Sequence, residues 1–550
     1  METTTNVTPP QKSSKKGLLI AGVAGIAILA GLGTAYAKLD LFKSPKTMYL
    51  EAEANSIKQL ADDVSQSFQE YEDYVKPYLD QPVSSTVELS QFHIDADLPD
   101  PQALKVLDLL QSAKLVVSSQ TDDQKRQQAG NVEVHLKENK LLQLDYFIDD
   151  TKIGFRLPDF YPKYGFLDLK DRDAIKAKFG EELPKRFVTN KDMYEAIKFD
   201  RQEVTAILAP YAKLYAESLK DEQITLNKNA SFSEEGYEAS VRELTVTFSD
   251  AEGQKLFIDL AEKAKADEKL FELLYSRYQN VAKLLIDSGY PDVQELSKDD
   301  FKKEYTKTFD DMVAEFKDTK ASKDQLKMIV LVDSDHQILS RKLVFLDDAS
   351  KEEKTVWSSA SFQKGTETFQ RYSLFVDEDG EKGEMTVRYK ADKQKDKTSG
   401  TLSFLFDAQP EVLFDLTAKF ETAKQADKED SKLDFTLKAK SDTDPEAISL
   451  SGNLTSAMTK TANGRDAEGS FKLNFDQPTH DMPKSISLAI KTKEEFGKPV
   501  SVPSLAADNS VNIATMTDAE MMEIQQQVAI SAQSFMMKNM ELVQEFMPMQ

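Results

Sequence analysis

The sequence predicts an α+β fold: an N-terminal transmembrane helix, then an ectodomain of twisted antiparallel β-meanders packed with amphipathic helices. Three observations lead to this class. An uncharged run occupies residues 17–37, apolar residues recur with a helical period at 49–68 and in parts of 190–318, and apolar and polar residues alternate from 402 to 490. A period near 3.6 is typical of helices, and a period of two is typical of strands with one solvated face.

Residues 17–37 read GLLIAGVAGIAILAGLGTAYA and carry no charge. A helix of this length spans about 30 Å, which matches the hydrocarbon core of a bilayer. The sequence therefore predicts a transmembrane anchor here. The residues expected within the membrane include Gly17, Leu18, Ile20, Ile26, Ile28, Leu29 and Ala37.

Three lysines precede this run, at Lys12, Lys15 and Lys16. Lys and Arg are enriched on cytoplasmic flanks, so we expect a cytoplasmic tail at 1–16 and an extracellular large domain. An alternative is a cleaved secretory signal, because Ala35 and Ala37 form an A-x-A pattern. The run exceeds the usual length of a signal's apolar region, which favours retention as a single-pass membrane anchor.

Composition excludes several classes of site. The 550 residues contain no cysteine, so disulfides, thiolate metal sites and a lipoprotein-type cysteine anchor are impossible. The formal net charge of -24 makes nucleic acid an improbable partner, since phosphate binding needs a basic surface. Lack of cysteine together with a lysine-flanked anchor suggests the cell envelope of a Gram-positive bacterium.

Five regions are expected after the anchor. Ser44 and Pro45 are suited to begin a juxtamembrane helix within 38–82, and Pro77 is expected near its end. The regions that follow are a first α+β region at 83–222, a strand pair and helical region at 223–320, an antiparallel β-meander at 321–496, and a connector with a Met-rich C-terminal helix at 497–550.

The meander carries the clearest pattern. Apolar residues alternate with Ser, Thr, Lys, Asp and Asn, which predicts one apolar and one solvated face. Helices of the middle region, or the C-terminal helix, are expected to cover the apolar face. The alternating positions include Leu402, Phe404, Phe406, Phe414, Leu416, Ala418, Phe420, Leu433, Phe435, Leu437, Ala439, Ile448, Leu450, Leu454, Phe471, Leu473, Phe475, Ile486, Leu488 and Ile490.

No catalytic, metal or cofactor motif is complete. Ser361 and Lys364 match S-x-x-K, but the K-T-G that accompanies this motif in penicillin-binding proteins is missing. The four histidines lack metal-ligand spacing. We therefore expect no enzyme activity, no cofactor and no metal. The alternative is an active site of carboxylates that only folding would bring together.

The segment after the anchor resembles an uncharacterised family of single-pass, membrane-anchored extracytoplasmic proteins of low-GC Gram-positive bacteria. The match is carried by a Ser-Pro-Lys and Tyr-Leu-x-x-Glu pattern at Ser44, Pro45, Lys46, Tyr49, Leu50 and Glu53. That resemblance implies no activity and no site residues. The meander with apposed helices is also similar in architecture to the half-barrels of lipoprotein and lipid carriers, without a shared motif.

These observations predict a membrane-anchored extracytoplasmic binding protein that holds a lipid or other apolar ligand between sheet and helices. The alternative is a structural or accessory envelope scaffold that acts through protein–protein contacts. The expected partners are the membrane, through the N-terminal helix, and either an apolar ligand or an envelope protein. The space between sheet and helices distinguishes them, because a sealed core, an open apolar cleft and a polar pocket imply different functions.

Overall fold

A computed structural model describes residues 43–97, 101–198, 201–317, 322–378, 381–408, 411–441, 444–476 and 482–540. Its strands form one 20-stranded sheet. Neighbouring strands run in the order β7 to β19, then β1 to β6, then β20, and all neighbours are antiparallel except β6 and β20. β1 joins the two parts, because it pairs with β19 on one side and β2 on the other.

The strands have these bounds: β1 Val83–Asp95, β2 Ala113–Asp122, β3 Gln127–Leu136, β4 Asn139–Ile148, β5 Lys152–Leu157, β6 Tyr161–Asp168, β7 Ile224–Glu234, β8 Tyr237–Ser249, β9 Gln325–Val332, β10 Ile338–Leu346, β11 Glu353–Lys364, β12 Glu367–Glu378, β13 Glu381–Lys393, β14 Lys397–Ala408, β15 Glu411–Gln425, β16 Lys428–Ser441, β17 Asp444–Thr461, β18 Gly464–Phe475, β19 Ser485–Phe496 and β20 Ser510–Asn512. The α-helices have these bounds: α2 Pro45–Asp80, α3 Pro101–Gln111, α4 Arg172–Phe179, α5 Asn190–Ile197, α6 Arg201–Ser218, α7 Asp250–Ala266, α8 Glu268–Asp287, α9 Lys298–Lys317 and α10 Asp518–Lys538.

Helix α2 begins as the sequence predicts. The Ser44 hydroxyl accepts a hydrogen bond from the Thr47 backbone N–H, and Pro45 occupies the first turn, where its missing N–H costs nothing. Pro77 lies in the last turn instead of ending the helix. At about 1.5 Å per residue, the 36 residues of α2 extend about 54 Å.

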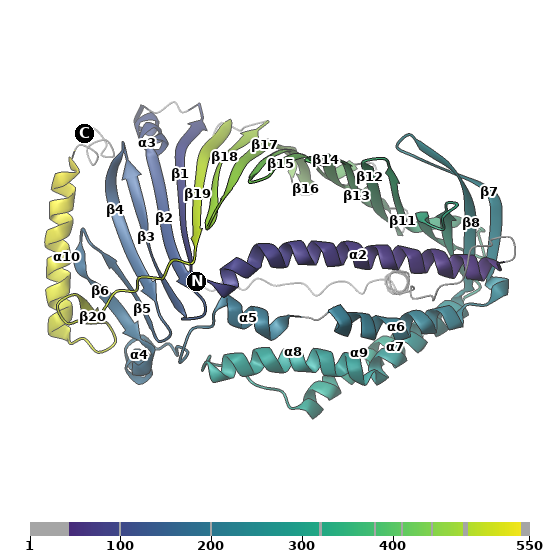
Figure 1. Cartoon of the computed structure of the whole chain (residues 1–550), viewed down its shortest axis with the longest axis horizontal. Helices are drawn as coiled ribbons and strands as arrows, with labels where there is room; N and C mark the ends of the chain where they lie inside the picture. The colour runs from purple at the N-terminus through teal and green to yellow at the C-terminus, as the bar shows by residue number, and fades with distance from the viewer. Residues whose placement is uncertain are drawn as a thin grey trace.

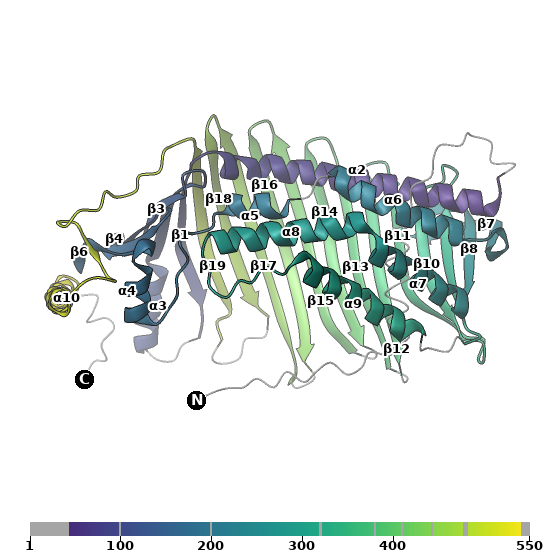
Figure 2. The same ribbon diagram turned by 90° about the horizontal axis from the view of Figure 1, so that it is seen from below.

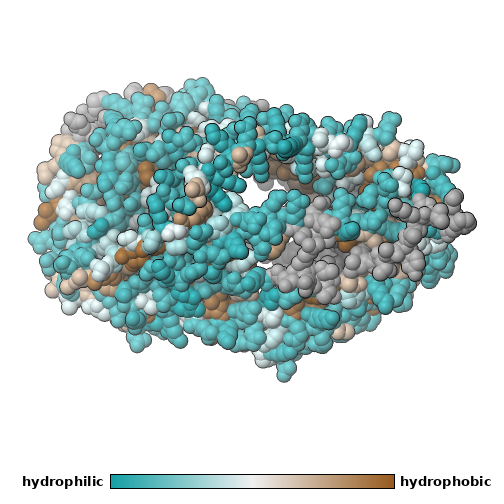
Figure 3. Space-filling model, in the orientation of Figure 1, coloured by the Kyte–Doolittle hydropathy of each residue, from teal (hydrophilic) through white to brown (hydrophobic). Residues whose placement is uncertain are grey.

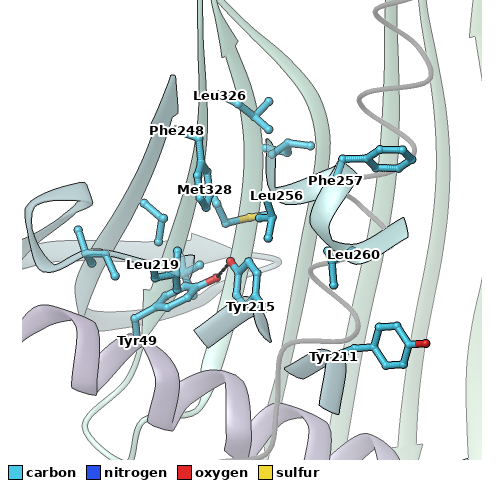
Figure 4. Close-up of a cluster of buried hydrophobic side chains, with 14 of the residues drawn as sticks. Tyr49, Tyr211, Tyr215, Leu219, Phe248, Leu256, Phe257, Leu260, Leu326 and Met328 are labelled. Carbon is cyan, nitrogen blue, oxygen red and sulfur yellow. Dashed lines mark hydrogen bonds between the residues drawn. The ribbon is translucent and has the colours of Figure 1, made fainter. Parts of the chain in front are cut away.

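The main core lies at one end of the sheet. There α2, α6, α7, α9 and strands β7 to β10 contribute buried side chains to one cluster, among them Tyr49, Tyr215, Leu244, Leu256 and Val330. Figure 4 shows Tyr49 and Tyr215 pointing toward one another from α2 and α6. Apolar burial in this cluster fixes the helices against the sheet.

The rest of the sheet curves away from the helices. In Figure 1 the strands form an arch, and α2 runs beneath it from the core end toward β1 and β19. Seen from below in Figure 2, α2 crosses the strands, while α5, α6 and α8 lie on the side of α2 away from the sheet. The helical layer thus faces the concave side of the arch.

These observations correct the predicted fold class. The expected meanders are parts of one continuous sheet, because pairing of β1 with β19 joins strands far apart in sequence. The C-terminal helix does not cover the apolar face of the long strands. It lies beside β6, where Phe535 of α10 contacts Phe160 with ring centroids 5.0 Å apart.

The predicted membrane arrangement is corrected as well. None of the described helices is both long and apolar enough to cross a bilayer. The longest, α2, carries charged residues such as Glu51, Lys58 and Glu70 along its length. The described structure therefore contains no counterpart of the expected single-pass anchor, on which the predicted extracellular location depended. The predicted anchor residues Gly17, Leu18, Ile20, Ile26, Ile28, Leu29 and Ala37 and the flanking Lys12, Lys15 and Lys16 lie outside the described residues.

Candidate functional site

Four rows of uncharged side chains cross the long strands on one face. Directly paired residues of antiparallel strands point to the same face, so the register identifies each row. The first row is Leu374, Met385, Phe406, Phe414, Ala439 and Ile448. The second is Tyr372, Val387, Phe404, Leu416, Leu437, Leu450 and Phe475.

The third row is Tyr389, Leu402, Ala418, Phe435, Gly452, Leu473, Ile486 and Ile94. The fourth is Gly400, Phe420, Leu433, Leu454, Phe471 and Leu488. We call the face that carries these rows the inner face. Alternate residues such as Ser403, Lys419, Thr436 and Asn453 point to the opposite face, which is polar.

Helix α2 lies over the inner face at both of its ends. Near its start, Glu53 binds Arg341 of β10, which pairs with Val330 in the core and therefore points inward. Near its end, Tyr74 and Tyr78 stack against Arg465 of β18, which shares the parity of Phe471. Two contacts on the same face, near the two ends of the helix, show that α2 crosses the concavity.

Between these two contacts the inner face is open. Within the described part of β14 to β19, no hydrophobic side chain is buried. Leu402 is 43% exposed, Phe406 38% and Ile448 59%. Exposed apolar side chains in one contiguous area, rather than scattered singly, are typical of a binding surface.

Figure 3 shows the corresponding opening, which lies between the sheet and α2 in the middle of the molecule. Phe68 and Tyr71 are about half exposed, and their spacing places them on the same side of α2 as Tyr74 and Tyr78. They therefore face the concavity from the helix side. We call the space bounded by the four rows and this side of α2 the apolar groove.

A buried polar cluster closes the core end of the groove. Arg341 Nη2 donates to a Glu53 carboxylate oxygen at 2.8 Å and to Ser56 Oγ at 2.9 Å. Burial alone would lower the pKa of Arg341, but the adjacent Glu53 charge outweighs burial and raises it. Burial also raises the pKa of Tyr49 well above its usual range, so its hydroxyl stays neutral beside Tyr215. This cluster is a fixed structural anchor.

An aromatic clasp holds the other end of α2. The Arg465 guanidinium lies 4.3 Å from the Tyr74 ring centroid and 5.6 Å from those of Tyr78 and Phe496. The Tyr78 hydroxyl donates to Glu494 of β19 at 2.5 Å. Burial and this carboxylate together raise the pKa of Tyr78. Cation–π contacts of this kind are directional and so set the angle at which α2 meets the sheet.

The candidate motifs of the sequence are not brought together in the described residues. They contain no group of three or more His, Asp or Glu side chains placed to hold a metal ion. Ser361 and Lys364 are three apart on β11, so their side chains point to opposite faces and cannot act together. His135 contacts Glu133 on the same strand, and His336 contacts Glu51 of α2, so each of the two histidines lies beside a carboxylate.

Sequence alternation identifies most groove residues on β14 to β19. It does not identify Tyr372, Leu374 and Met385, because the alternation is weaker on β12 and β13. The clasp at Arg465 also has no local sequence signal, since its partners come from α2 and β19. Only a helix aromatic pair at i, i+4 (Tyr74 and Tyr78) hints at a contact surface there.

Comparisons with known proteins add little. No protein-family model matches the chain, and no curated protein matches it. Similar solved structures include a loop-deletion mutant of OmpT, an outer membrane protein of Vibrio cholerae, at 8% identity over 76% of this chain and 98% of that chain, TM-score 0.21. Others are a BenF-like porin from Pseudomonas fluorescens Pf-5, at 7% over 76% and 99%, TM-score 0.23, and OccK9 of Pseudomonas aeruginosa, at 8% over 76% and 98%, TM-score 0.22. TM-scores of this size carry no argument about fold or function.

Proposed function

We propose that this protein binds a lipid or another long apolar molecule in the apolar groove. One observation carries the proposal: the inner face of β14 to β19 keeps its apolar side chains partly exposed although α2 spans the concavity above them. Leaving apolar surface in water costs about 25 cal/mol per Å². An apolar occupant that covers these rows removes that cost.

The backbone of the sheet favours a hydrocarbon occupant over an extended peptide. Each strand from β12 to β19 is paired on both sides, so its N–H and C=O groups are already used. A peptide lying on the rows would find few partners for its own backbone groups, and unpaired buried polar groups are costly. A hydrocarbon chain has no such requirement.

The same face offers little to a polar or charged ligand. The four rows contain no charged residue, and their polar atoms are the hydroxyls of Tyr372 and Tyr389 at one end. A charged ligand would lose its hydration without gaining an ion pair. The groove therefore favours the hydrocarbon part of a ligand and leaves any polar headgroup toward solvent.

Native mass spectrometry of the purified full-length chain, after removal of detergent, tests the proposal. We expect a bound long-chain lipid, and displacement of the fluorescent fatty acid cis-parinaric acid by added oleate. Phe404→Asp places a charge in the second row and should weaken cis-parinaric acid binding at least ten-fold.

Leu405→Asp is the matched control, because Leu405 is the next residue on β14 and points to the opposite face. It should fold and bind as the wild type does. Circular dichroism of both variants shows whether β14 remains intact. Wild-type protein that carries no lipid and does not bind cis-parinaric acid would overturn the proposal.

A scaffold function acting through protein contacts is the second candidate, and helix α10 favours it. None of its described side chains is buried, and Met522, Ile530, Met536 and Met537 are each more than half exposed. Methionine side chains adapt to varied apolar partners. A photo-crosslinker at position 536 should then capture one protein reproducibly, while a crosslinker at the solvated Lys419 should capture none.

A further inference from the structure

The length of the apolar groove limits what occupies it. Its rows extend from β12 through β19 to β1, which are nine neighbouring strands. At a spacing of about 4.8 Å between strands, eight intervals give about 38 Å. A bilayer core of about 30 Å holds two opposed acyl chains, so one chain needs about 15 Å.

The groove is also continuous along this length. From β13 onward, each row passes from strand to strand with only apolar, aromatic or glycine residues over its own span, and the third row is unbroken from β13 through β19 to β1. Two glycines on the inner face leave space for the large aromatic rings beside them. Gly400 lies beside the Phe420 ring and Gly452 beside the Phe435 ring. No charged side chain divides the surface into separate sites.

The polar groups lie at the ends of the groove. The Glu53–Arg341 pair lies at the core end, and the Arg465 clasp holds α2 over β18 and β19. Partial exposure continues between them, from 41% at Leu374 to 59% at Ile448. A small apolar ligand would leave much of this area uncovered, whereas long chains that lie across the strands would cover it.

From this geometry we infer that the groove holds two long acyl chains at once, laid end to end across the strands, so that the ligand class is long-chain lipid. The inference rests on the proposed function and specifies its ligand. One chain lies over β12 to β15 and the other over β16 to β19. The uncharged rows make the interaction depend on chain length and not on headgroup charge.

The experiment uses two variants that obstruct opposite ends, in the full-length chain. Met385→Asp places a charge under the first chain, and Leu473→Asp places one under the second. Each protein is equilibrated with the single-chain ligand palmitate, and the bound palmitate molecules are counted by native mass spectrometry, while phosphatidylcholine and phosphatidylglycerol vesicles are used only to compare headgroups. Asn474→Asp is the matched control, because it adds the same charge on the opposite face of β18.

We expect two acyl chains on the wild type and on Asn474→Asp, one on each obstructed variant, and none on the double variant. A photoreactive palmitate should label β18 and β19 in Met385→Asp, and β13 and β14 in Leu473→Asp. Laurate should bind more weakly than palmitate, and phosphatidylcholine should bind as well as phosphatidylglycerol.

Other outcomes overturn the inference in distinguishable ways. A single chain that one variant abolishes and the other leaves intact would show one compact site, while the proposed function would stand. Absence of any lipid on the wild type would refute the proposed function itself. A photo-crosslinker at Leu416 that joins residues 17–37 of the same chain, with no lipid recovered, would show that the protein's own apolar segment fills the groove.

Discussion

Arg341 of β10 and Glu53 of α2 form an ion pair at 2.8 Å in which the carboxylate is completely buried. The pair lies where the sheet leaves the packed core and the open concavity begins. It holds the start of α2 against the inner face, while the Arg465 clasp holds the other end. Helix α2 therefore covers the groove between these two contacts in a fixed position.

Removing the charge of Glu53 should destabilise this end of the fold. Glu53→Gln leaves the Arg341 guanidinium buried without its counter-ion, and breaking one partner of a buried pair costs about 3–5 kcal/mol. Urea denaturation followed by circular dichroism measures the loss. The double variant Glu53→Leu with Arg341→Met removes both charges and should recover most of it. Equal stability of Glu53→Gln and wild type would contradict the prediction.

The Arg465 clasp should stabilise the last turns of α2 without affecting the stability of the core. Arg465→Gln loses the contacts with the rings of Tyr74, Tyr78 and Phe496, which together contribute roughly 1–2 kcal/mol. Hydrogen exchange should become faster in the last turns of α2 and stay unchanged near Tyr49. Arg465→Lys keeps a cation over the rings and should restore part of the protection. Uniform acceleration over the whole helix would contradict this local role.

Buried tyrosines should make the protein lose stability in alkali. Burial, reinforced by Asp267 and Glu268, raises the pKa of Tyr305 to about 12. The unfolded chain releases this proton near pH 10, so between about pH 10 and 12 the unfolded state binds fewer protons and stability falls as pH rises. The free energy of unfolding is measured by urea titration at several pH values. Its slope against pH should be less steep in Tyr305→Phe, by an amount that corresponds to at most one proton. An unchanged slope would show that Tyr305 does not contribute.

How far the sequence predicts the structure depends on whether a feature is local. Ser44 and Pro45 fix the start of α2, and the alternation around Leu402 and Leu416 identifies the inner face. Both can be predicted because helix caps and strand periods depend on residues close together in sequence. The pairing of Val83 with Phe496 cannot be predicted from neighbouring residues. Alternation indicates which face of the sheet a residue occupies, but not which strand lies beside it. The single sheet and the span of α2 both follow from that pairing.

The candidate site also combines features that the sequence predicts with features that it does not. The apolar rows follow from alternation, but their exposure does not, because Phe406 would read identically beneath a packed helix. Exposure depends on where α2 is held, which is set by Arg341 and Arg465 through partners distant in sequence. A sequence therefore predicts an apolar face readily and an open groove only once the tertiary contacts are known.

Gly452 provides a test that joins stability to binding. A Cβ at this position would lie 2.6 Å from the Phe435 ring and 2.5 Å from the backbone oxygen of Lys472. Gly452→Ala should therefore lower stability by about 1–3 kcal/mol, because the close-packed ring and strand must shift. The displaced Phe435 ring occupies part of the groove, so binding of cis-parinaric acid should weaken as well.

Gly253 supplies the comparison, because it lies within helix α7 and a Cβ there would meet no atom within 4 Å other than its chain neighbours and the backbone of its own helix. Gly253→Ala should be neutral or stabilise the protein by up to about 1 kcal/mol, and it should bind cis-parinaric acid as the wild type does. Thermal unfolding and fluorescence titration of the two variants separate the effects. If Gly452→Ala lost stability and kept full affinity, the Phe435 side chain would not line the binding surface. If both glycine variants bound equally and were equally stable, the tight approach of β16 and β17 would have no energetic role.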